Sequence, residues 1–224
     1  MRHGFLRVDK PAGPTSHDVV QQVRRALSER SIGHLGTLDP AASGLLVLAV
    51  GAKALKVLEL FMGLPKEYEA VVRFGEVSTT YDGEGAIEAV ARKPGVPEPD
   101  PESIRQAIQS RFLGRIRQVP PAHSAVHVDG KRAYELAREG KRVEMPEREV
   151  EIHAIEGASF AYPEVTLRVR CGSGTYIRSL AHDLGGALRT GAYLKALRRT
   201  SVGPWSVEGA LRPDAARWTD VLPL

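Results

Sequence analysis

One aspartate in this sequence is placed where a carboxylate could do chemistry. Asp39 lies in the segment 33–40, GHLGTLDP. Glycine permits backbone conformations that other residues resist, and Pro40 keeps Asp39 out of helical geometry. A stiff loop of this kind can present a carboxylate as a nucleophile, a base or a metal ligand. The same residues also fit an ordinary Asp-Pro turn, in which the carboxylate binds backbone N–H groups.

Two further segments carry groups that would suit such a carboxylate. Residues 172–178, GSGTYIR, form a glycine-rich turn that leads into a helix, with Arg178 near its start. If Arg178 met Asp39, its positive charge would keep the carboxylate ionised. Tyr68, early in an expected strand, offers a ring that can stack on a base and a hydroxyl that can move a proton. A solvated arginine and a tyrosine at the edge of the core are the ordinary alternatives.

The sequence gives no sign of a metal or cofactor site. Cys171 is the single cysteine, which excludes an internal disulfide and a cysteine-cluster metal site. His123 and His127 lie four residues apart, but the prolines before them argue against one helix face, and acidic neighbours at ligand spacing are missing. Residues 172–180 lack the Walker pattern of nucleoside triphosphate sites. We therefore expect no metal and no cofactor.

Charge is distributed unevenly along the chain. The 31 Lys and Arg exceed the 27 Asp and Glu by four. Residues 76–104 hold seven acids and two bases, whereas residues 111–142 hold eight bases and three acids, and residues 178–199 five bases and one acid. Opposite fields on different segments suggest a basic face for a polyanion such as RNA. A solvated charged face is the alternative for the stretch 111–142.

The elements that must position these groups mix helices and strands without a regular βαβ rhythm. Helical spacing is expected at 16–27, capped by Ser16, and at 52–62, 102–113, 132–138 and 174–188. Strands are expected at 5–9, 45–50, 66–74 and 165–171, with an irregular loop at 31–43 and a turn at 82–85. The clean alternation of residues 165–171 favours an antiparallel sheet. The fold class is therefore predicted as α+β, with a mixed, largely antiparallel sheet and flanking helices.

Length and hydropathy limit the class of protein further. The 224 residues suit one large domain, or one domain with a small appendage. The longest unbroken apolar run, Leu45–Val50, is far shorter than the roughly 20 residues of a membrane-spanning helix. The first ten residues hold no apolar stretch of signal-peptide length. We expect a cytoplasmic protein.

Taken in order, the segments resemble the motifs of the TruB family of tRNA pseudouridine synthases, from Leu6 to about Trp205. The matching motifs are Val8-Asp9-Lys10-Pro11-x-Gly13-x-Thr15-Ser16-x-Asp18, Gly33 to Pro40 with Ala42-x-Gly44, Lys66-x-Tyr68, Pro120-Pro121-x-x-Ser124-Ala125 with Gly130-Lys131-Arg132-x-Tyr134-x-x-Ala137-Arg138-x-Gly140, Gly174-Thr175-Tyr176-Ile177-Arg178 with Asp183-Leu184-Gly185, and Leu197-Arg198-Arg199. Several ordered motifs are far more specific than any one of them.

The resemblance implies a pseudouridine synthase fold with a central RNA-binding cleft. It implies a catalytic domain at residues 1–205, with an RNA-clamping insertion at about 111–142. Residues 206–224 would be a short C-terminal tail, without a complete PUA-type RNA-binding domain. The implied reaction isomerises uridine-55 in the T-loop of tRNA, after the base has been flipped out of the loop.

The resemblance also assigns roles to individual residues. Asp39 is the expected catalytic carboxylate, acting at C1′ or C2′ of the ribose, with Arg178 as its partner and Tyr68 against the flipped uracil. The residues expected at or beside the substrate are His34, Gly36, Thr37, Tyr176, Leu197 and Lys10, the last more as a support of the loop than as a contact. The residues expected on the RNA-contacting basic face are Lys131, Arg132, Arg138, Arg198 and Arg199.

Three other functions fit parts of the pattern. The chain could bind and fold tRNA as a chaperone without catalysis, or modify another RNA as a guide-dependent synthase. It could be a glycoside hydrolase, although that chemistry normally needs two acids and no second acid lies in a comparable motif. A monomer that binds tRNA without an obligate protein partner or a membrane is the expected state.

Overall fold

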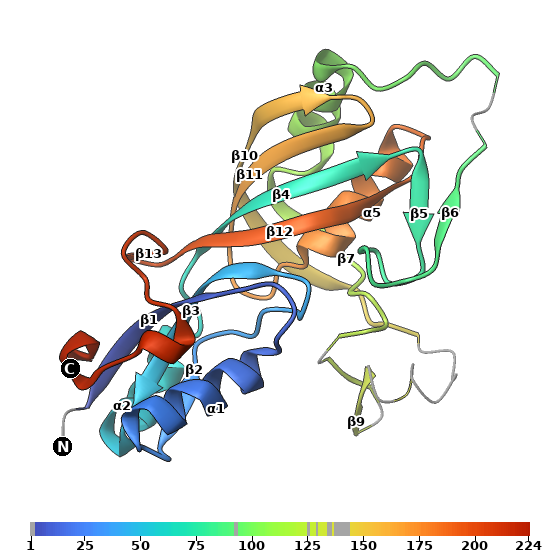
Figure 1. Ribbon diagram of the computed structural model, residues 1–224. Coiled ribbons are helices and arrows are strands. Elements are labelled where there is room, and N and C mark those ends of the chain that lie inside the picture. Colours follow the sequence, from blue (N-terminus) through green and yellow to red (C-terminus); the bar gives the residue numbers. More distant parts are fainter. Residues whose placement is uncertain (1–2, 92–93, 125, 129, 134–135, 137–143) are drawn as a thin grey trace. The chain divides into compact units, whose positions relative to one another are not determined.

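The computed structural model describes residues 3–224 except 92–93, 125, 129, 134–135 and 137–143 (Figure 1). The chain divides into two compact units. Unit 1 comprises residues 1–69 and 197–224, and unit 2 comprises residues 70–196. The chain passes from one unit to the other within strands β4 (Lys66–Phe74) and β12 (Ala192–Val202).

Unit 1 is built on strand β3 (Ser43–Val50), which helices and strands cover on both faces. Leu46, Leu48 and Val50 point to one core with α1, and Leu45, Val47 and Ala49 point to a second core. A strand that is buried on both faces needs apolar residues at every position, which explains the run from Leu45 to Val50. In the second core, the rings of Phe5 and Phe61 meet edge to face at 4.9 Å.

The other elements of unit 1 surround this strand. They are β1 (Gly4–Lys10), α1 (Ser16–Leu27), β2 (Ile32–His34), α2 (Ala52–Val57), η1 (Leu58–Phe61), β13 (Trp205–Ser206), η2 (Pro213–Ala215), η3 (Trp218–Asp220) and β14 (Leu222–Pro223). The strand order is β14, β1, β3 and then the end of β12, while β2 pairs with β3 and β13 with β12. The pairs of β1 with β3 and β14, and of β2 with β3, are antiparallel, whereas β3 and β12 run parallel.

Unit 2 contains a meander of antiparallel strands. Its elements are β5 (Glu76–Ser78), β6 (Ile87–Ala89), α3 (Pro101–Arg111), β7 (Gly114–Gln118), β8 (His127–Val128), β9 (Lys131–Arg132), β10 (Arg148–Ala161), β11 (Glu164–Cys171) and α5 (Ile177–Ala187). The strand order is β4, β11, β10 and β7, and β10 pairs antiparallel with both β11 and β7. β5 with β6 and β8 with β9 form small hairpins. Val165, Leu167, Val169 and Cys171 of β11 are buried, as their alternation predicted.

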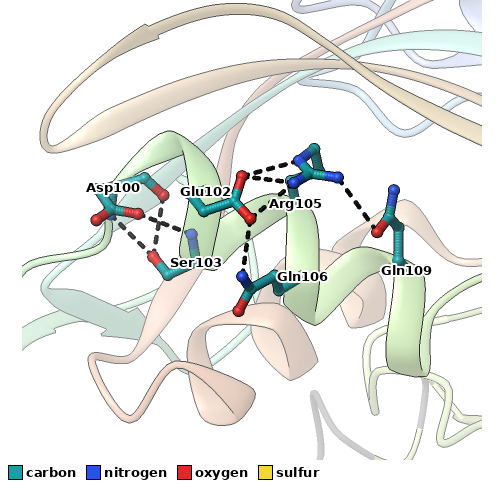
Figure 2. A network of polar contacts seen from close by, with 6 residues as sticks. All are labelled: Asp100, Glu102, Ser103, Arg105, Gln106 and Gln109. Carbon is teal, nitrogen blue, oxygen red and sulfur yellow. Dashed lines mark hydrogen bonds and ion pairs between the residues drawn. The ribbon is translucent and has the colours of Figure 1, made fainter.

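Helix α3 packs its apolar residues Ile104 and Ile108 inward. Asp100 caps its N-terminus through a reciprocal pair of bonds with Ser103, and Glu102 pairs with Arg105 at 2.6 Å on the exposed face (Figure 2). The helix thus obeys ordinary capping and side-chain pairing rules.

The predicted α+β class and the largely antiparallel sheet are confirmed, with local corrections. Residues 31–43 are not wholly irregular, because β2 lies within them. The helix expected at 52–62 is α2 followed by the tighter turn of η1. Most of the helix expected at 132–138 lies outside the described residues. Among the helices that the structure describes, none is long and apolar enough to cross a membrane.

Candidate active site

The backbone just before Asp39 is fixed by a buried serine. Ser16 was expected to cap α1, but Thr15 is the cap and forms a reciprocal pair with Asp18. The hydroxyl of Ser16 instead accepts the N–H of Leu38 and donates to the C=O of Leu38, both at 2.9 Å. One side chain therefore satisfies both polar backbone groups of the residue that precedes Asp39.

The backbone just after Asp39 is fixed by a buried lysine. The ammonium of Lys10, fully excluded from solvent, donates to the C=O groups of Pro40 at 3.0 Å, Ala42 at 2.6 Å and Pro11 at 3.0 Å. A buried ammonium is tolerated only when hydrogen-bond acceptors surround it. Lys10 thus supports the loop from inside, and a contact of Lys10 with substrate stays a prediction.

The ends of the loop are tied together by Arg199. Its guanidinium donates to the C=O of Leu45 at 2.7 Å and to the C=O of Gly36 at 3.1 Å. Arg199 is only 1 % exposed and binds these backbone carbonyls, which makes it a support of the loop, and its RNA contact stays a prediction. Gly44, at φ +102°, allows this arrangement, since a Cβ there would lie 2.2 Å from the Arg199 carbonyl oxygen.

Arg198, beside it, has a different environment. It forms a bidentate pair with Asp9, at 3.0 and 2.8 Å, and its side chain is 39 % exposed. A part-exposed guanidinium can still meet a phosphate. Its RNA contact remains a prediction.

His34 lies at the end of β2, just before the loop. Burial of the imidazole, followed by the charge of Arg199, lowers the pKa of His34 below its ordinary value. The ring is therefore neutral at pH 7, which suits packing against an uncharged base better than binding a phosphate. Within the loop itself, Thr37 is exposed and Asp39 is half-buried.

Tyr68 and Lys66 share one face of β4, because side chains alternate along a strand. Both are buried, at 9 % and 7 % exposure. Lys66 donates to the C=O of Met62 at 2.9 Å, and its Cε lies 4.0 Å from where a Cβ on Gly36 would stand. This face of β4 therefore borders the loop. Leu197 of β12 is half-buried and shares a strand face with Arg199.

Arg178 of unit 2 is buried rather than solvated. Its guanidinium pairs with Asp82 at 3.2 Å, and donates to the C=O of Thr80 at 3.3 Å and of His123 at 3.0 Å. Arg178 and Asp82 are each 5 % exposed. These acceptors hold the arginine in a geometry that a planar guanidinium can fill.

Asp82 lies in the predicted turn at 82–85 and is not among the site residues that the sequence predicts. Its carboxylate also accepts the hydroxyl of Thr80 and the N–H of Glu84, the latter at 3.0 Å. Gly85 makes room for this turn, because a Cβ there would lie within 2.7 Å of the hydroxyls of Ser78, Thr79 and Thr80. The sequence signal for this turn is the run Ser78, Thr79 and Thr80 before Asp82, together with the two glycines that follow it.

Tyr176 of unit 2 is positioned by Gln118, a second residue that the sequence analysis missed. The amide of Gln118 donates to the C=O of Tyr176 at 3.3 Å and accepts its N–H at 3.1 Å. Ser179 adds a bond to the C=O of Val119 at 2.7 Å. The start of α5 is therefore joined to the end of β7.

The predicted site residues are divided between the units. Asp39, Tyr68, His34 and Leu197 belong to unit 1, and Arg178 and Tyr176 belong to unit 2. The contact expected between Asp39 and Arg178 stays a prediction, as does the central cleft. On the expected basic face, Lys131 of β9 is exposed and Arg132 follows it in the strand. Arg138 lies outside the described residues.

Comparison with known proteins assigns the chain to a family. Residues 24–177 match the TruB family pseudouridylate synthase N-terminal domain, and residues 178–214 match the tRNA pseudouridylate synthase B C-terminal domain. The expected domain boundary at residue 205 stays a prediction.

Named relatives and solved structures agree. The tRNA pseudouridine synthase B of Thermobifida fusca is 48 % identical over all of this chain and 78 % of its own length. That of Gloeobacter violaceus is 48 % identical over 93 % of this chain and 70 % of its own. A solved chain of a Cbf5-Nop10-Gar1 complex has 32 % identity and a TM-score of 0.69, over 91 % of this chain and 50 % of that one.

The motif order, the fold and these similarities point the same way. The chain belongs to the TruB family of pseudouridylate synthases, which are isomerases.

Proposed function

We propose that this protein isomerises uridine-55 in the T-loop of tRNA to pseudouridine. The relatives named tRNA pseudouridine synthase B, at 47–48 % identity, support a tRNA substrate. The reaction breaks the N1–C1′ bond, rotates the uracil and joins C5 to C1′. The proton lost from C5 is balanced by one gained at N1, so no oxidant, reductant or co-substrate is needed.

The observation that carries the proposal is the way in which Asp39 is presented. Ser16 holds the backbone of Leu38, and Lys10 holds that of Pro40, so the residue between them has little freedom. A preorganised carboxylate meets a reacting carbon without the entropy loss of ordering a mobile loop. Asp39 attacks C1′ or removes a proton at C2′, and both routes need the ionised carboxylate.

The neighbouring residues would receive the flipped base. Tyr68 stacks on the uracil and assists removal of the C5 proton, and neutral His34 occupies or braces the space that the base leaves. Tyr176 and Leu197 wall the pocket, and Gly36 and Thr37 border it. Arg178 keeps the Asp39 carboxylate ionised, because a nearby cation favours the charged form.

RNA binding would depend on phosphate contacts by basic side chains. The residues proposed for it are Lys131, Arg132, Arg138 and Arg198. Such contacts make affinity fall as salt rises, because binding releases counterions from the RNA. We propose that the protein does this as a monomer in the cytoplasm, without an obligate protein partner.

The test is release of tritium from a T-arm hairpin labelled at C5 of the target uridine. The purified chain alone should release label into water, and Asp39→Asn should bind the hairpin without release. Binding by the wild-type chain without release would support a tRNA-folding chaperone instead. Normal turnover by Asp39→Asn would remove Asp39 from the mechanism.

A further inference from the structure

One residue of the turn 78–86 in unit 2 has an unfavourable backbone conformation. Tyr81 has a φ of +64°, in the left-handed region that a bulky residue rarely adopts. Such a conformation persists only where the surrounding contacts hold it, and it concentrates at functional sites. The contacts of Tyr81 therefore show what the turn is built to do.

Three contacts hold Tyr81. Its N–H donates to the C=O of Ser78 at 3.1 Å, and its C=O accepts the N–H of Leu194 at 2.9 Å. Its ring stacks almost flat on the imidazole of His182, with 4.0 Å between ring centroids and 13° between planes. The ring stack joins the turn to α5. Of the backbone hydrogen bonds, the one to Ser78 lies within the turn and the one from Leu194 joins the turn to β12.

His182 lies one helical turn after Arg178 on α5. Residues four apart lie on the same side of a helix. Consecutive residues of the turn thus contact this side of α5: Asp82 pairs with Arg178 at 3.2 Å, and Tyr81 stacks on His182. The turn therefore contacts the helix at two neighbouring points, and the second contact involves the residue just before Asp82.

The environment of the stack fits this role. Burial, and then the charge of Asp183, raise the pKa of Tyr81, so its phenol stays neutral. The buried Nδ1 of His182 has no hydrogen-bond partner among the residues that the structure describes. Among the contacts within the described residues, the stack on Tyr81 is the one that orients this imidazole.

We propose that Tyr81 and His182 are positioning residues, whose stacked rings hold Asp82 against Arg178 and so fix the arginine for catalysis. The inference rests on the proposed function, since it requires Arg178 to act in the reaction. Neither ring needs to contact the RNA. Loss of the stack would let the turn leave its left-handed conformation and carry Asp82 away from the guanidinium.

The first test separates kcat from KM on the T-arm hairpin. His182→Ala should lower kcat by about tenfold, the change that one aromatic pair can contribute, with KM unchanged. His182→Phe keeps a flat ring and should restore most of kcat. His153→Ala, the same change at an exposed position of β10 in the same unit, is the matched control and should alter neither constant.

Two outcomes of this test would overturn the proposal. One is an unchanged kcat in His182→Ala, and the other is a loss that His182→Phe does not rescue. Because His182→Ala could destabilise unit 2, urea midpoints are measured for each variant. Tyr81→Ala breaks the same stack from the other side and should lower kcat equally.

A second test asks whether the rings act through Asp82. In an Asp82→Asn background, His182→Ala should add little to the loss, because contacts in one network are not additive. If His182→Ala lowers kcat by the same factor in the Asp82→Asn background as in the wild-type chain, the proposal is contradicted. If Asp82→Asn and Arg178→Lys lower turnover but His182→Ala does not, only the positioning role fails. If Arg178→Lys turns over normally, the proposed role of Arg178 fails, and this inference fails with it.

Discussion

The loop 35–42 of unit 1 and the turn 78–86 of unit 2 each carry one aspartate, and different contacts hold them. Around Asp39, distant side chains bind the backbone on either side, through Ser16 and Lys10. In the turn, the carboxylate of Asp82 binds the hydroxyl of Thr80, the N–H of Glu84 and the guanidinium of Arg178. In the first arrangement the backbone on both sides of a carboxylate is held, and in the second the carboxylate binds an arginine.

Among the substitutions that test this difference between the two regions, Arg178→Lys in unit 2 should have the largest effect on kcat. An ammonium cannot reach Asp82, Thr80 and His123 together, so the cation would be misplaced and kcat should fall by about a hundredfold. Single-turnover product formation measures the rate, and filter binding measures the smaller loss of affinity. Arg105→Lys, on the exposed face of α3 (Figure 2), is the control. An unchanged rate would mean that Asp82 positions nothing that the reaction needs.

In unit 1 the corresponding change is Lys10→Met. It removes the ammonium that the carbonyls of Pro11, Pro40 and Ala42 accept, of which the Pro40 carbonyl keeps the N–H of Gly13. The free energy of unfolding should fall by about 3 kcal/mol. Urea denaturation measures this loss, and kcat should fall as the loop gains freedom. Lys53→Met, at an exposed position of α2, should change neither quantity. A stable, fully active Lys10→Met would show that the loop does not need its inner support.

A finer test compares two adjacent hydroxyls. Ser16→Ala should lower the free energy of unfolding by about 1–2 kcal/mol and also lower kcat, because it releases Leu38. Thr15→Ala removes only the cap of α1, so it should cost about 1 kcal/mol and leave kcat unchanged. Thermal or urea unfolding and the tritium assay measure both variants. Equal effects on kcat would mean that Ser16 matters only to the helix.

The smallest expected effect is a pH dependence from His34. Burial and Arg199 lower the pKa of His34 in the folded state. Below the unfolded value of about 6.5, the unfolded chain binds a proton that folded His34 resists, so stability should fall as pH drops. His34→Phe should remove part of the difference in urea midpoint between pH 7 and pH 5. An identical difference in the two proteins would place His34 in an ordinary environment.

The sequence predicted those helices and strands whose residues contact sequence neighbours or pack into one continuous core. The run Leu45–Val50 identified β3, and the alternation of Val165 to Cys171 identified β11. Both patterns follow from burial on two faces or one face of a strand, which is a local property.

The roles of side chains that bind groups far away in the sequence could not be predicted from such local patterns. Ser16 and Thr15 are both common caps, and Thr15 takes the role because it pairs with Asp18 while the hydroxyl of Ser16 binds the distant Leu38. Arg199 is buried because β12 runs parallel to β3, a pairing of segments far apart in sequence. Asp82 acquires its role from Arg178 for the same reason.

The proposed reaction requires that the fixed loop present residue 39 to the ribose of the target nucleotide. The most direct measurement is a crystal structure of Asp39→Asn bound to a T-arm hairpin. The side chain at 39 should lie in contact with C1′ or C2′ of a flipped uridine, on a loop still bound by Ser16 and Lys10. A ribose bound elsewhere, with residue 39 facing solvent or a phosphate, would rule out a role for Asp39 in the reaction.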